Sequence, residues 1–393
     1  MSIYRGPLDG IRVADFTTGL AGPFSTQILT WLGAEVIKIE SMEHSSLLRQ
    51  TTEARFINTN LAKLSTTINL TRPEGLDLAR RIITVSDVLA ESFRPGVMTG
   101  FGLDYEAVRK IKPDIIMISL SGFGQTPPEG HYRTWASIFG GMGGLTHLTG
   151  YPDGIPCNER GANDTRGGQY AAFAVLTALC YRMRTGQGQY LDLAVRDVIC
   201  CHIGDVLLDY TMNLRDRGRR GNLDDKMSPH NCYRCKGDDK WISIAVATDD
   251  EWRSLCKAMG MTELPENRRF ADARDRWQNQ DELDRIITAW TLNHTHYEIM
   301  EILQAANVAA VPSLNCEEIY NDRHLKSRGF VKEVEHPERG KQVVTGPPWI
   351  LSATETNLDT SPLMGQHNDY IFGDLLGLSK HEISKLREDQ AIY

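Results

Sequence analysis

Short apolar runs alternate with amphipathic stretches along the first half of the chain. An apolar run between turn residues is typical of a buried strand, whereas apolar positions three or four residues apart are typical of a helix. Because helical stretches separate the apolar runs, we expect a parallel sheet with helices on both faces, in a doubly wound α/β domain. The predicted strands lie within residues 11–16, 35–40, 65–70, 87–93, 114–124 and 189–195.

The alternation of strands and helices stops at residues 214–231, where charged and turn-forming residues predominate. We place a domain boundary there. Beyond it, a hairpin turned at residues 236–239, a helical region and a second hairpin at residues 330–346 predict a smaller α+β domain. The expected parts are a large domain at 1–215, a small domain at 226–330 and a return to the large domain at 331–393.

The composition is that of an ordinary globular protein, with 41% hydrophobic and 24% charged residues among 393. A net charge of −8 argues against broad nucleic-acid binding. The N-terminal residues lack the pattern of a signal peptide, and no apolar run reaches the roughly 18 residues of a membrane span. We therefore expect a cytoplasmic protein that binds neither nucleic acid nor membrane.

Several common functional motifs are absent. Cys232 and Cys235 have the spacing of half a zinc site, but no second half follows nearby, so we expect no metal site. The chain has no G-x-G-x-x-G after the first strand and no G-x-x-x-x-G-K-[ST], which argues against a dinucleotide or a P-loop site. The absence of G-x-S-x-G disfavours a serine hydrolase.

The long helix predicted at residues 163–186 begins with Asp164 and carries Gly167 and Gly168 in its first turns. A glycine inside a helix costs roughly 1 kcal/mol relative to alanine, so this pair indicates close approach of another group to the backbone. Aspartate is also a favoured N-cap, stabilised at a helix N-terminus without any catalytic role. From the spacing alone, both a functional and a capping role for Asp164 stay open.

Several sequence blocks occur together in one order along the chain. They include PLDGIRVADFT, AGPFSTQILTWLGAEVIKIE, ESFRPGVM, NDTRGGQYAAFAVLTAL and PLMGQHNDYIFGDLLGLS. In these blocks the chain resembles the class III CoA-transferases, the CaiB/BaiF family, which includes the formyl-CoA transferases. The resemblance implies a Rossmann-like large domain with a smaller second domain, and two interlocked subunits. It also implies acyl-CoA and a carboxylic acid as substrates, with no permanently bound cofactor.

The resemblance places Asp164 at the position of the family's nucleophile. It implies that this aspartate attacks an acyl-CoA thioester to form an aspartyl anhydride, and then an aspartyl-CoA thioester. A helix N-terminus favours the ionised form that such a nucleophile needs, so we expect a low pKa. Gly167 and Gly168 would leave room for the thioester beside N–H groups that hold an oxyanion. The alternative for the glycines is tight helix packing.

The resemblance also implies a CoA site, for which the predicted residues are Ala21, Phe93 for adenine, Arg94 for phosphate, and Arg133. The sequence departs from the formyl-CoA transferases at several positions. Ser41 and Ser92 replace an arginine and an asparagine, and Ala136 replaces an acidic residue, so any role of that carboxylate is lost or moved. The glycine-rich flap of some members is reduced to residues 217–222, with Gly218 and Gly221.

Two alternative functions stay open. An α-methylacyl-CoA racemase-like epimerase needs a histidine beside the aspartate, but Trp135 stands at that position, and His131 and His147 are displaced. The second alternative is that the chain is a noncatalytic subunit of a hetero-oligomeric CoA-transferase. The expected assembly is a homodimer or a heteromer with a related subunit.

The sequence suits two kinds of acid substrate. An aromatic acyl group would suit one set of residues, and a second carboxylate, as in succinyl-CoA, would suit another. The first set is Tyr132, Trp135 and Tyr151, and the second is Arg55, Arg160 and Arg166.

Overall fold

The computed structural model describes residues 6–43, 49–50, 53–126, 128–159, 161–356 and 358–393. The chain forms two compact units. The first comprises Met1–His147, Cys157–Arg217 and His324–Tyr393, and the second comprises Leu148–Pro156 and Gly218–Arg323.

Residues 148–156, which the sequence pattern assigned to the large domain, belong to the second unit. They are joined there to the segment predicted as a reduced flap. The Gly221 N–H donates to the Gly150 carbonyl at 2.8 Å, and the Asn222 amide donates to the Tyr151 hydroxyl at 3.1 Å. These contacts are between residues about 70 positions apart, so no local pattern predicts them.

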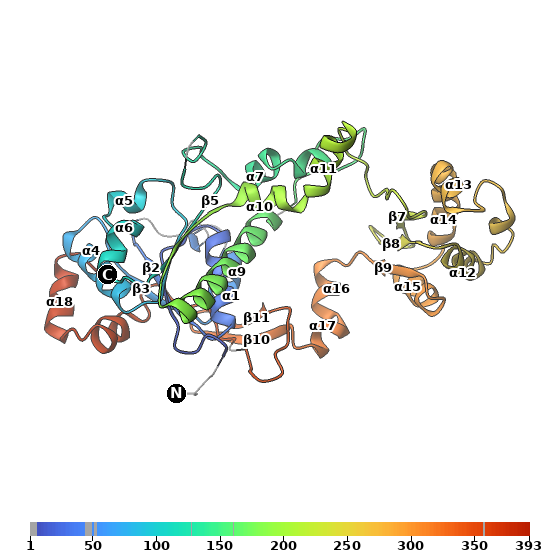
Figure 1. The fold of residues 1–393 in the computed structure, drawn as a ribbon. Helices are drawn as coiled ribbons and strands as arrows, with labels where there is room; N and C mark the ends of the chain where they lie inside the picture. The colour runs from blue at the N-terminus through green and yellow to red at the C-terminus, as the bar shows by residue number, and fades with distance from the viewer. Residues whose placement is uncertain (1–5, 44–48, 51–52, 127, 160, 357) are drawn as a thin grey trace. The chain divides into compact units, whose positions relative to one another are not determined.

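A six-stranded sheet forms the centre of the first unit (Figure 1). Its strands are β1 (Arg12–Asp15), β2 (Glu35–Glu40), β3 (Leu64–Thr67), β4 (Val88–Glu91), β5 (Ile116–Ser121) and β6 (Tyr190–Ala194). All neighbours are parallel, in the order β3-β2-β1-β4-β5-β6. This confirms the predicted doubly wound α/β fold. The order reverses between β1 and β4, and ligands of this fold class bind outside the carboxyl ends of the strands at such a point.

Helices cover both faces of this sheet. Alternate residues of the strands point to opposite faces, so Val13 and Val88 contribute to one core, whereas Ala14 and Leu89 contribute to the other. The first core includes α1 (Ala21–Trp31) and α9 (Ala162–Thr185), which lie side by side in Figure 1. The second includes α4 (Pro73–Thr84), α6 (Tyr105–Ile111), the π-helix η2 (Tyr370–Leu375) and α18 (Lys380–Glu388).

Shorter elements complete the first unit. The helices are α3 (Glu53–Asn58), α5 (Val97–Gly100), α7 (Ala136–Met142), α8 (Leu145–Leu148), α10 (Val195–His202), α11 (Gly204–Asn213) and α17 (Arg323–Ser327). The predicted second hairpin is confirmed as antiparallel β10 (Val331–His336) and β11 (Gly340–Thr345). Among the described residues, no helix is long and apolar enough to cross a membrane, and no three His, Cys, Asp or Glu side chains gather as metal ligands would.

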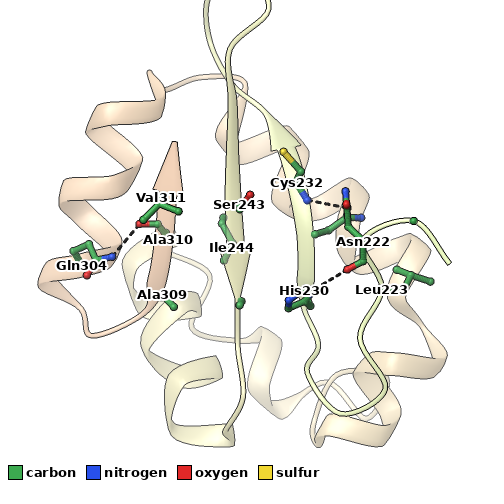
Figure 2. Close-up of a pocket in the computed structure, with 13 residues that line it drawn as sticks. Asn222, Leu223, His230, Cys232, Ser243, Ile244, Gln304, Ala309, Ala310 and Val311 are labelled. Atoms are coloured by element: carbon green, nitrogen blue, oxygen red, sulfur yellow. Dashed lines mark hydrogen bonds between the residues drawn. The ribbon is translucent and has the colours of Figure 1, made fainter. Parts of the chain in front are cut away.

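The second unit is built on an antiparallel sheet in the order β7-β8-β9. Its strands are β7 (His230–Arg234), β8 (Trp241–Ala245) and β9 (Ala309–Pro312). Its helices are α12 (Asp249–Met259), the 3-10 helix η1 (Leu264–Glu266), α13 (Ala273–Gln278), α14 (Gln280–Thr291), α15 (His296–Ala305) and α16 (Cys316–Asn321). A hollow of about 470 Å³ lies along these strands. Figure 2 shows residues that line it, among them Cys232, Ser243 and Val311. The sheet and its helices confirm the expected α+β character.

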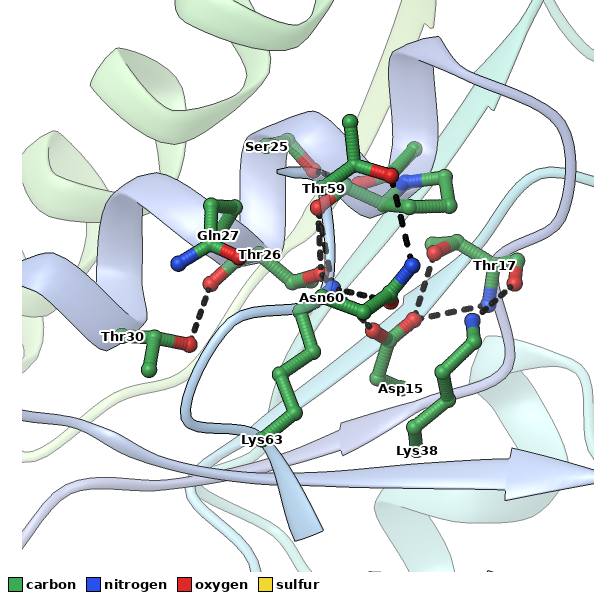
Figure 3. Close-up of polar contacts among 12 residues, drawn as sticks. Asp15, Thr17, Ser25, Thr26, Gln27, Thr30, Lys38, Thr59, Asn60 and Lys63 are labelled. Carbon is green, nitrogen blue, oxygen red and sulfur yellow. Dashed lines mark hydrogen bonds and ion pairs between the residues drawn. The ribbon is translucent and has the colours of Figure 1, made fainter. Parts of the chain in front are cut away.

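A buried polar network underlies the carboxyl ends of β1 and β2 (Figure 3). Asp15 and Lys63 form an ion pair at 3.1 Å, and both side chains are fully buried. Asp15 also accepts hydrogen bonds from the Thr17 N–H and hydroxyl, whereas the Lys63 ammonium donates to the Pro23 carbonyl at 2.9 Å. A second buried cation, Lys38, donates to the Thr17 carbonyl at 3.0 Å. Both ends of residues 17–23 are therefore held by buried charges.

The charges in this network depend on one another. Burial raises the pKa of Asp15, but the positive charges of Lys63 and Lys38 and the hydroxyls of Thr17 and Thr26 outweigh it and hold the pKa at about 2. The carboxylate is therefore ionised at neutral pH. Removing one partner of a buried pair leaves an uncompensated charge, which is more costly than the pair itself.

We expect Lys63→Met to lower the free energy of unfolding by about 3–5 kcal/mol, since Asp15 loses its nearest cation. Urea denaturation at neutral pH measures the change. Lys110→Met, which removes an exposed lysine from α6 in the same unit, is the control and should change stability by less than about 0.5 kcal/mol. The double variant Asp15→Asn/Lys63→Met should recover part of the loss. Equal free energies of unfolding for Lys63→Met and Lys110→Met would contradict the expected cost of leaving Asp15 without its cation.

Candidate active site

A cavity of about 500 Å³ opens in the first unit at the carboxyl ends of the strands. Its walls are the turn at residues 18–22 after β1, residues 120–122 at the end of β5, and residues 134–137 at the start of α7. Asp164 and Arg55 complete the lining from α9 and α3. The cavity lies where the strand order reverses, as the fold predicts for a ligand site.

Asp164 is the third residue of α9, not the residue that caps it. The helix begins at Ala162, and Gly161, with φ of 72°, is the N-cap. The predicted helix start was therefore one residue late, and the capping role for Asp164 is wrong. To the described residues, the Asp164 carboxylate makes no hydrogen bond, although it lies in the first turn, where the helix dipole favours an anion.

The pKa of Asp164 is raised, whereas the sequence predicted that it would be lowered. Burial of the carboxylate raises the pKa to about 6, against the opposing positive charge of Arg55. Desolvation outweighs the helix N-terminus because the carboxylate gains no hydrogen bond to offset its lost water. Asp164 is nevertheless mainly ionised at neutral pH. A poorly solvated carboxylate of this kind is suited to act as a nucleophile.

Packing between helices accounts for Gly167 and Gly168. A Cβ atom at Gly167 would lie 2.9 Å from Val195 Cγ2, and one at Gly168 would lie 2.6 Å from the carbonyl oxygen of Ala21. Both glycines are buried, and neither lines the cavity. The close approach predicted from the sequence is therefore made by α10 and α1, as the packing alternative expected. A role of nearby N–H groups as an oxyanion hole stays a prediction.

A second cavity, of about 370 Å³, adjoins the first and holds three of the predicted CoA-binding residues. Phe93, Arg94 and Arg133 line it, whereas Ala21 lines the Asp164 cavity. The two cavities have a common wall of Ser92, Ser121, Gly122, Thr134 and Trp135. The structure therefore brings the candidate nucleophile and the predicted CoA-binding residues into one cleft.

The second cavity is positively charged. Arg94 and Arg133 are exposed, and none of the described residues that line the cavity is acidic. Guanidinium groups bind phosphate oxygens through paired charge-assisted hydrogen bonds. This cavity is therefore suited to a phosphate-bearing ligand.

A third cavity, of about 250 Å³, lies on the other side of Phe93 and is mainly apolar. Its lining includes Phe16, Ile39 and Phe101, and also Ser41. The cavity is large enough for a planar ring but has no guanidinium among its described lining residues.

Sequence analysis missed Glu91, which supports the loop that carries Phe93. The Phe93 N–H donates to the Glu91 carboxylate at 2.7 Å, and burial raises the pKa of Glu91 to about 7. An acidic residue at the end of an apolar strand was the available signal. Glu91 therefore fixes the backbone of Phe93, a predicted CoA-binding residue.

Glu159 is a second carboxylate in the Asp164 cavity, which Ala136 also lines. It forms an ion pair with Arg166 at 2.6 Å. No sequence signal identified Glu159, because the loop before α9 brings it to the cavity. Glu159 therefore places a carboxylate in the cavity that Ala136 lines.

The remaining candidates are placed differently. Trp135 lines both main cavities and Tyr132 lines the second, whereas Tyr151 belongs to the second unit. No histidine is among the described residues that line the Asp164 cavity, so neither His131 nor His147 is there. Arg160 lies outside the described residues.

Comparisons with known proteins identify the family of the chain. A model of CoA-transferase family III matches residues 8–368. The chain is 35% identical to the succinyl-CoA–D-citramalate CoA-transferase of Chloroflexus aurantiacus, and 31% identical to the succinyl-CoA–L-malate CoA-transferase beta subunit of the same organism. Each alignment covers 98% of both chains. A crystal structure of a CAIB/BAIF family protein from Brucella suis superposes with a TM-score of 0.87 at 29% identity, covering 94% of this chain and 99% of that one.

The raised pKa of Asp164 predicts a pH-dependent cost to stability. Because the folded-state pKa lies above the unfolded value, Asp164 destabilises the fold increasingly as pH rises from about 4 to 6, and fully above 6. Asp164→Asn removes this cost. We expect the variant to be more stable than wild type by about 1–2 kcal/mol at pH 7 and by much less at pH 4.

Urea denaturation at both pH values measures this difference. Asp77→Asn, which removes an exposed carboxylate from α4, is the matched control. A stability difference for Asp164→Asn that stays constant between pH 4 and pH 7 would show that burial does not raise this pKa.

Proposed function

The chain belongs to CoA-transferase family III, and from this premise we propose that it moves CoA from an acyl-CoA to a free carboxylic acid through covalent intermediates on Asp164. The observation that carries the proposal is the Asp164 carboxylate itself. It is partly buried, ionised at neutral pH and without a hydrogen bond to the described residues, in a cavity that adjoins a cationic cleft. A carboxylate serving only the fold would be paired.

The proposed reaction has four steps, and every covalent intermediate is carried by Asp164. The Asp164 carboxylate attacks the thioester carbonyl of the donor, the C–S bond breaks, and CoA leaves as a thiolate with formation of a mixed anhydride. The thiolate attacks the aspartyl carbonyl and releases the donor acid as a carboxylate, leaving an aspartyl-CoA thioester. The acceptor carboxylate attacks this thioester and releases the thiolate, forming a second anhydride. The thiolate then attacks the acceptor carbonyl, which yields the new acyl-CoA and regenerates Asp164.

This sequence requires no net proton transfer and no oxidant or reductant. Each step exchanges one carboxylate or thiolate for another, so the protein needs to position the reactants and limit access of water, which would hydrolyse the anhydride. The cavity of about 500 Å³ is large enough for the acyl group, the thiolate and Asp164 together. The reaction thus needs no general acid beside Asp164.

We place CoA along the three adjoining cavities. The adenine ring would occupy the apolar cavity against Phe93, and the phosphates would lie against Arg94 and Arg133. The pantetheine arm would pass the wall formed by Thr134 and Trp135 and carry the thioester past Ala21 to Asp164. The support for this path is that neighbouring cavities have lining residues in common.

The acids named for two relatives guide the choice of substrates. Succinate, D-citramalate and L-malate each carry two carboxyl groups. We therefore propose succinyl-CoA as a donor and dicarboxylic acids as acceptors. We propose an interlocked homodimer, as the family resemblance implies. A heteromer is the alternative, because one relative is named as a beta subunit. Measuring the size of the purified chain tests whether it forms the homodimer by itself.

The epimerase alternative is less well supported. It requires a second acid–base group opposite Asp164, and no histidine is found among the described residues lining the cavity. A noncatalytic subunit would not need an ionised carboxylate that, among the described residues, has no hydrogen-bond partner in its cavity.

Covalent trapping tests the proposed nucleophile. Wild-type protein incubated with succinyl-CoA and then hydroxylamine should carry a hydroxamate at Asp164, because hydroxylamine attacks the activated aspartyl carbonyl. Peptide mass spectrometry locates the modification, and Asp164→Ala should show none. No adduct with any acyl-CoA, together with exchange of an α-proton in deuterated buffer, would indicate the epimerase. Neither signal would indicate a subunit that lacks its own activity.

Arg94→Ala tests the position of CoA. Losing a charge-assisted hydrogen bond to phosphate should raise the KM for acyl-CoA about tenfold and change kcat by less than about threefold. Steady-state assays against varied acyl-CoA separate the two parameters. Arg109→Ala removes an exposed arginine from α6 and is the control. A loss confined to kcat would contradict a phosphate-binding role.

A further inference from the structure

The structure distinguishes among the three arginines that suited a second carboxylate. Arg166 is already engaged, by the ion pair with Glu159 at 2.6 Å and a hydrogen bond to the Asn163 side chain at 3.2 Å. Arg160 lies outside the described residues. Arg55 lines the same cavity as Asp164 and is the one basic side chain among the described residues that do so.

The Arg55 guanidinium is exposed and, among the described residues, has no ion pair. Its charge nevertheless reaches Asp164, whose pKa it lowers against the larger effect of burial. Glu159, the other acidic residue of the lining, is neutralised by Arg166. The cavity thus has one anion and one cation that are not joined directly to each other.

The backbone that carries Arg55 is firmly held. The next residue, Phe56, is buried, and the Arg49 guanidinium lies 3.8 Å from the centre of its ring. Arg49 also makes two hydrogen bonds to the Glu40 carboxylate, at 3.0 and 2.8 Å. The Thr59 hydroxyl donates to the Arg55 carbonyl at 2.8 Å. Arg55 is therefore an exposed side chain on an anchored turn of α3, a suitable arrangement for a binding residue.

We propose that Arg55 binds the distal carboxylate of a dicarboxylic acyl group whose other carboxyl carbon is bonded to Asp164. This inference rests on the proposed function and adds the residue that selects the substrate. A guanidinium binds a carboxylate through two parallel hydrogen bonds, which a methyl or phenyl group cannot replace. Arg55 is then a specificity-determining residue rather than a nucleophile or a base.

The balance of charge supports this role. Acylation converts the Asp164 carboxylate into a neutral anhydride, so Arg55 loses its anionic neighbour at that step. A distal carboxylate on the acyl group restores the missing charge, whereas an aliphatic monoacid leaves the cation unbalanced. The attraction therefore increases when the covalent intermediate forms, and this favours acylation by dicarboxylic donors.

The same argument applies to donor and acceptor. Both acyl groups form anhydrides with the single Asp164, so both occupy this cavity in turn. Selection by Arg55 consequently requires a second carboxylate on each, and the enzyme exchanges CoA between two dicarboxylic acids. An arginine selecting only one partner would require a second nucleophile or a second cavity.

The experiment compares succinyl-CoA with butyryl-CoA, in which a methyl group replaces the distal carboxylate. Single-turnover trapping with hydroxylamine measures acylation of Asp164, and steady-state assays with isotopically labelled succinate or butyrate as acceptor measure transfer. Wild type should favour the dicarboxylic member of each pair by about 100-fold or more. Arg55→Ala should lower kcat/KM with the dicarboxylic acids about 100-fold and change it less than about threefold with the monoacids. Arg55→Lys should recover part of the selectivity.

The control is Arg109→Ala, which should behave as wild type with both acids, and circular dichroism checks that each variant is folded. Equal acylation by both donors in wild type, or equal losses with both acids in Arg55→Ala, overturns the role of Arg55 and leaves the transferase intact. No adduct at Asp164 with either donor overturns the proposed function and this inference together.

Discussion

The buried ion pair between Asp15 and Lys63 fixes the edge of the sheet on which the site is built. Asp15 ends β1, and its carboxylate holds the Thr17 N–H and hydroxyl, while Lys63 holds the Pro23 carbonyl across the same turn. The segment between these anchors lines the Asp164 cavity. Charged groups in a core are costly unless fully paired, so the pair is best understood as a means of setting one conformation of this turn rather than as a source of stability.

Burial acts to raise the pKa of both Asp15 and Asp164, but the groups around the two carboxylates differ. Asp15 is surrounded by cations and hydroxyls, which hold its pKa at about 2. Among the described residues Asp164 has only the charge of Arg55 to oppose burial, and its pKa rises to about 6. The contrast separates a carboxylate that serves the fold from one that is available for chemistry. A nucleophilic carboxylate needs to be charged but weakly hydrogen-bonded, and none of the described residues of the cavity donates a hydrogen bond to Asp164.

The sequence was sufficient for features that depend on local pattern. The six parallel strands and both hairpins are confirmed, and the family followed from blocks of residues in one order. Features that depend on contacts distant in sequence were missed or wrong. The start of α9 was misplaced because Gly161 ends the preceding loop in a left-handed conformation, and the pKa of Asp164 depends on burial that no motif encodes. Glu159 reaches the cavity only through the path of its loop.

Close packing of Gly168 against the Ala21 carbonyl fixes the start of α9 against the start of α1. Because α1 and α9 touch through backbone atoms at this point, with no side chain between them to absorb a shift, the two helix starts behave as one rigid block. The distance between the turn that receives the ligand and the carboxylate that reacts with it is therefore set during folding. Ligands of different length must be accommodated by the opposite wall, at residues 134–137, and variation in substrate among related chains should be concentrated there rather than along α1 and α9.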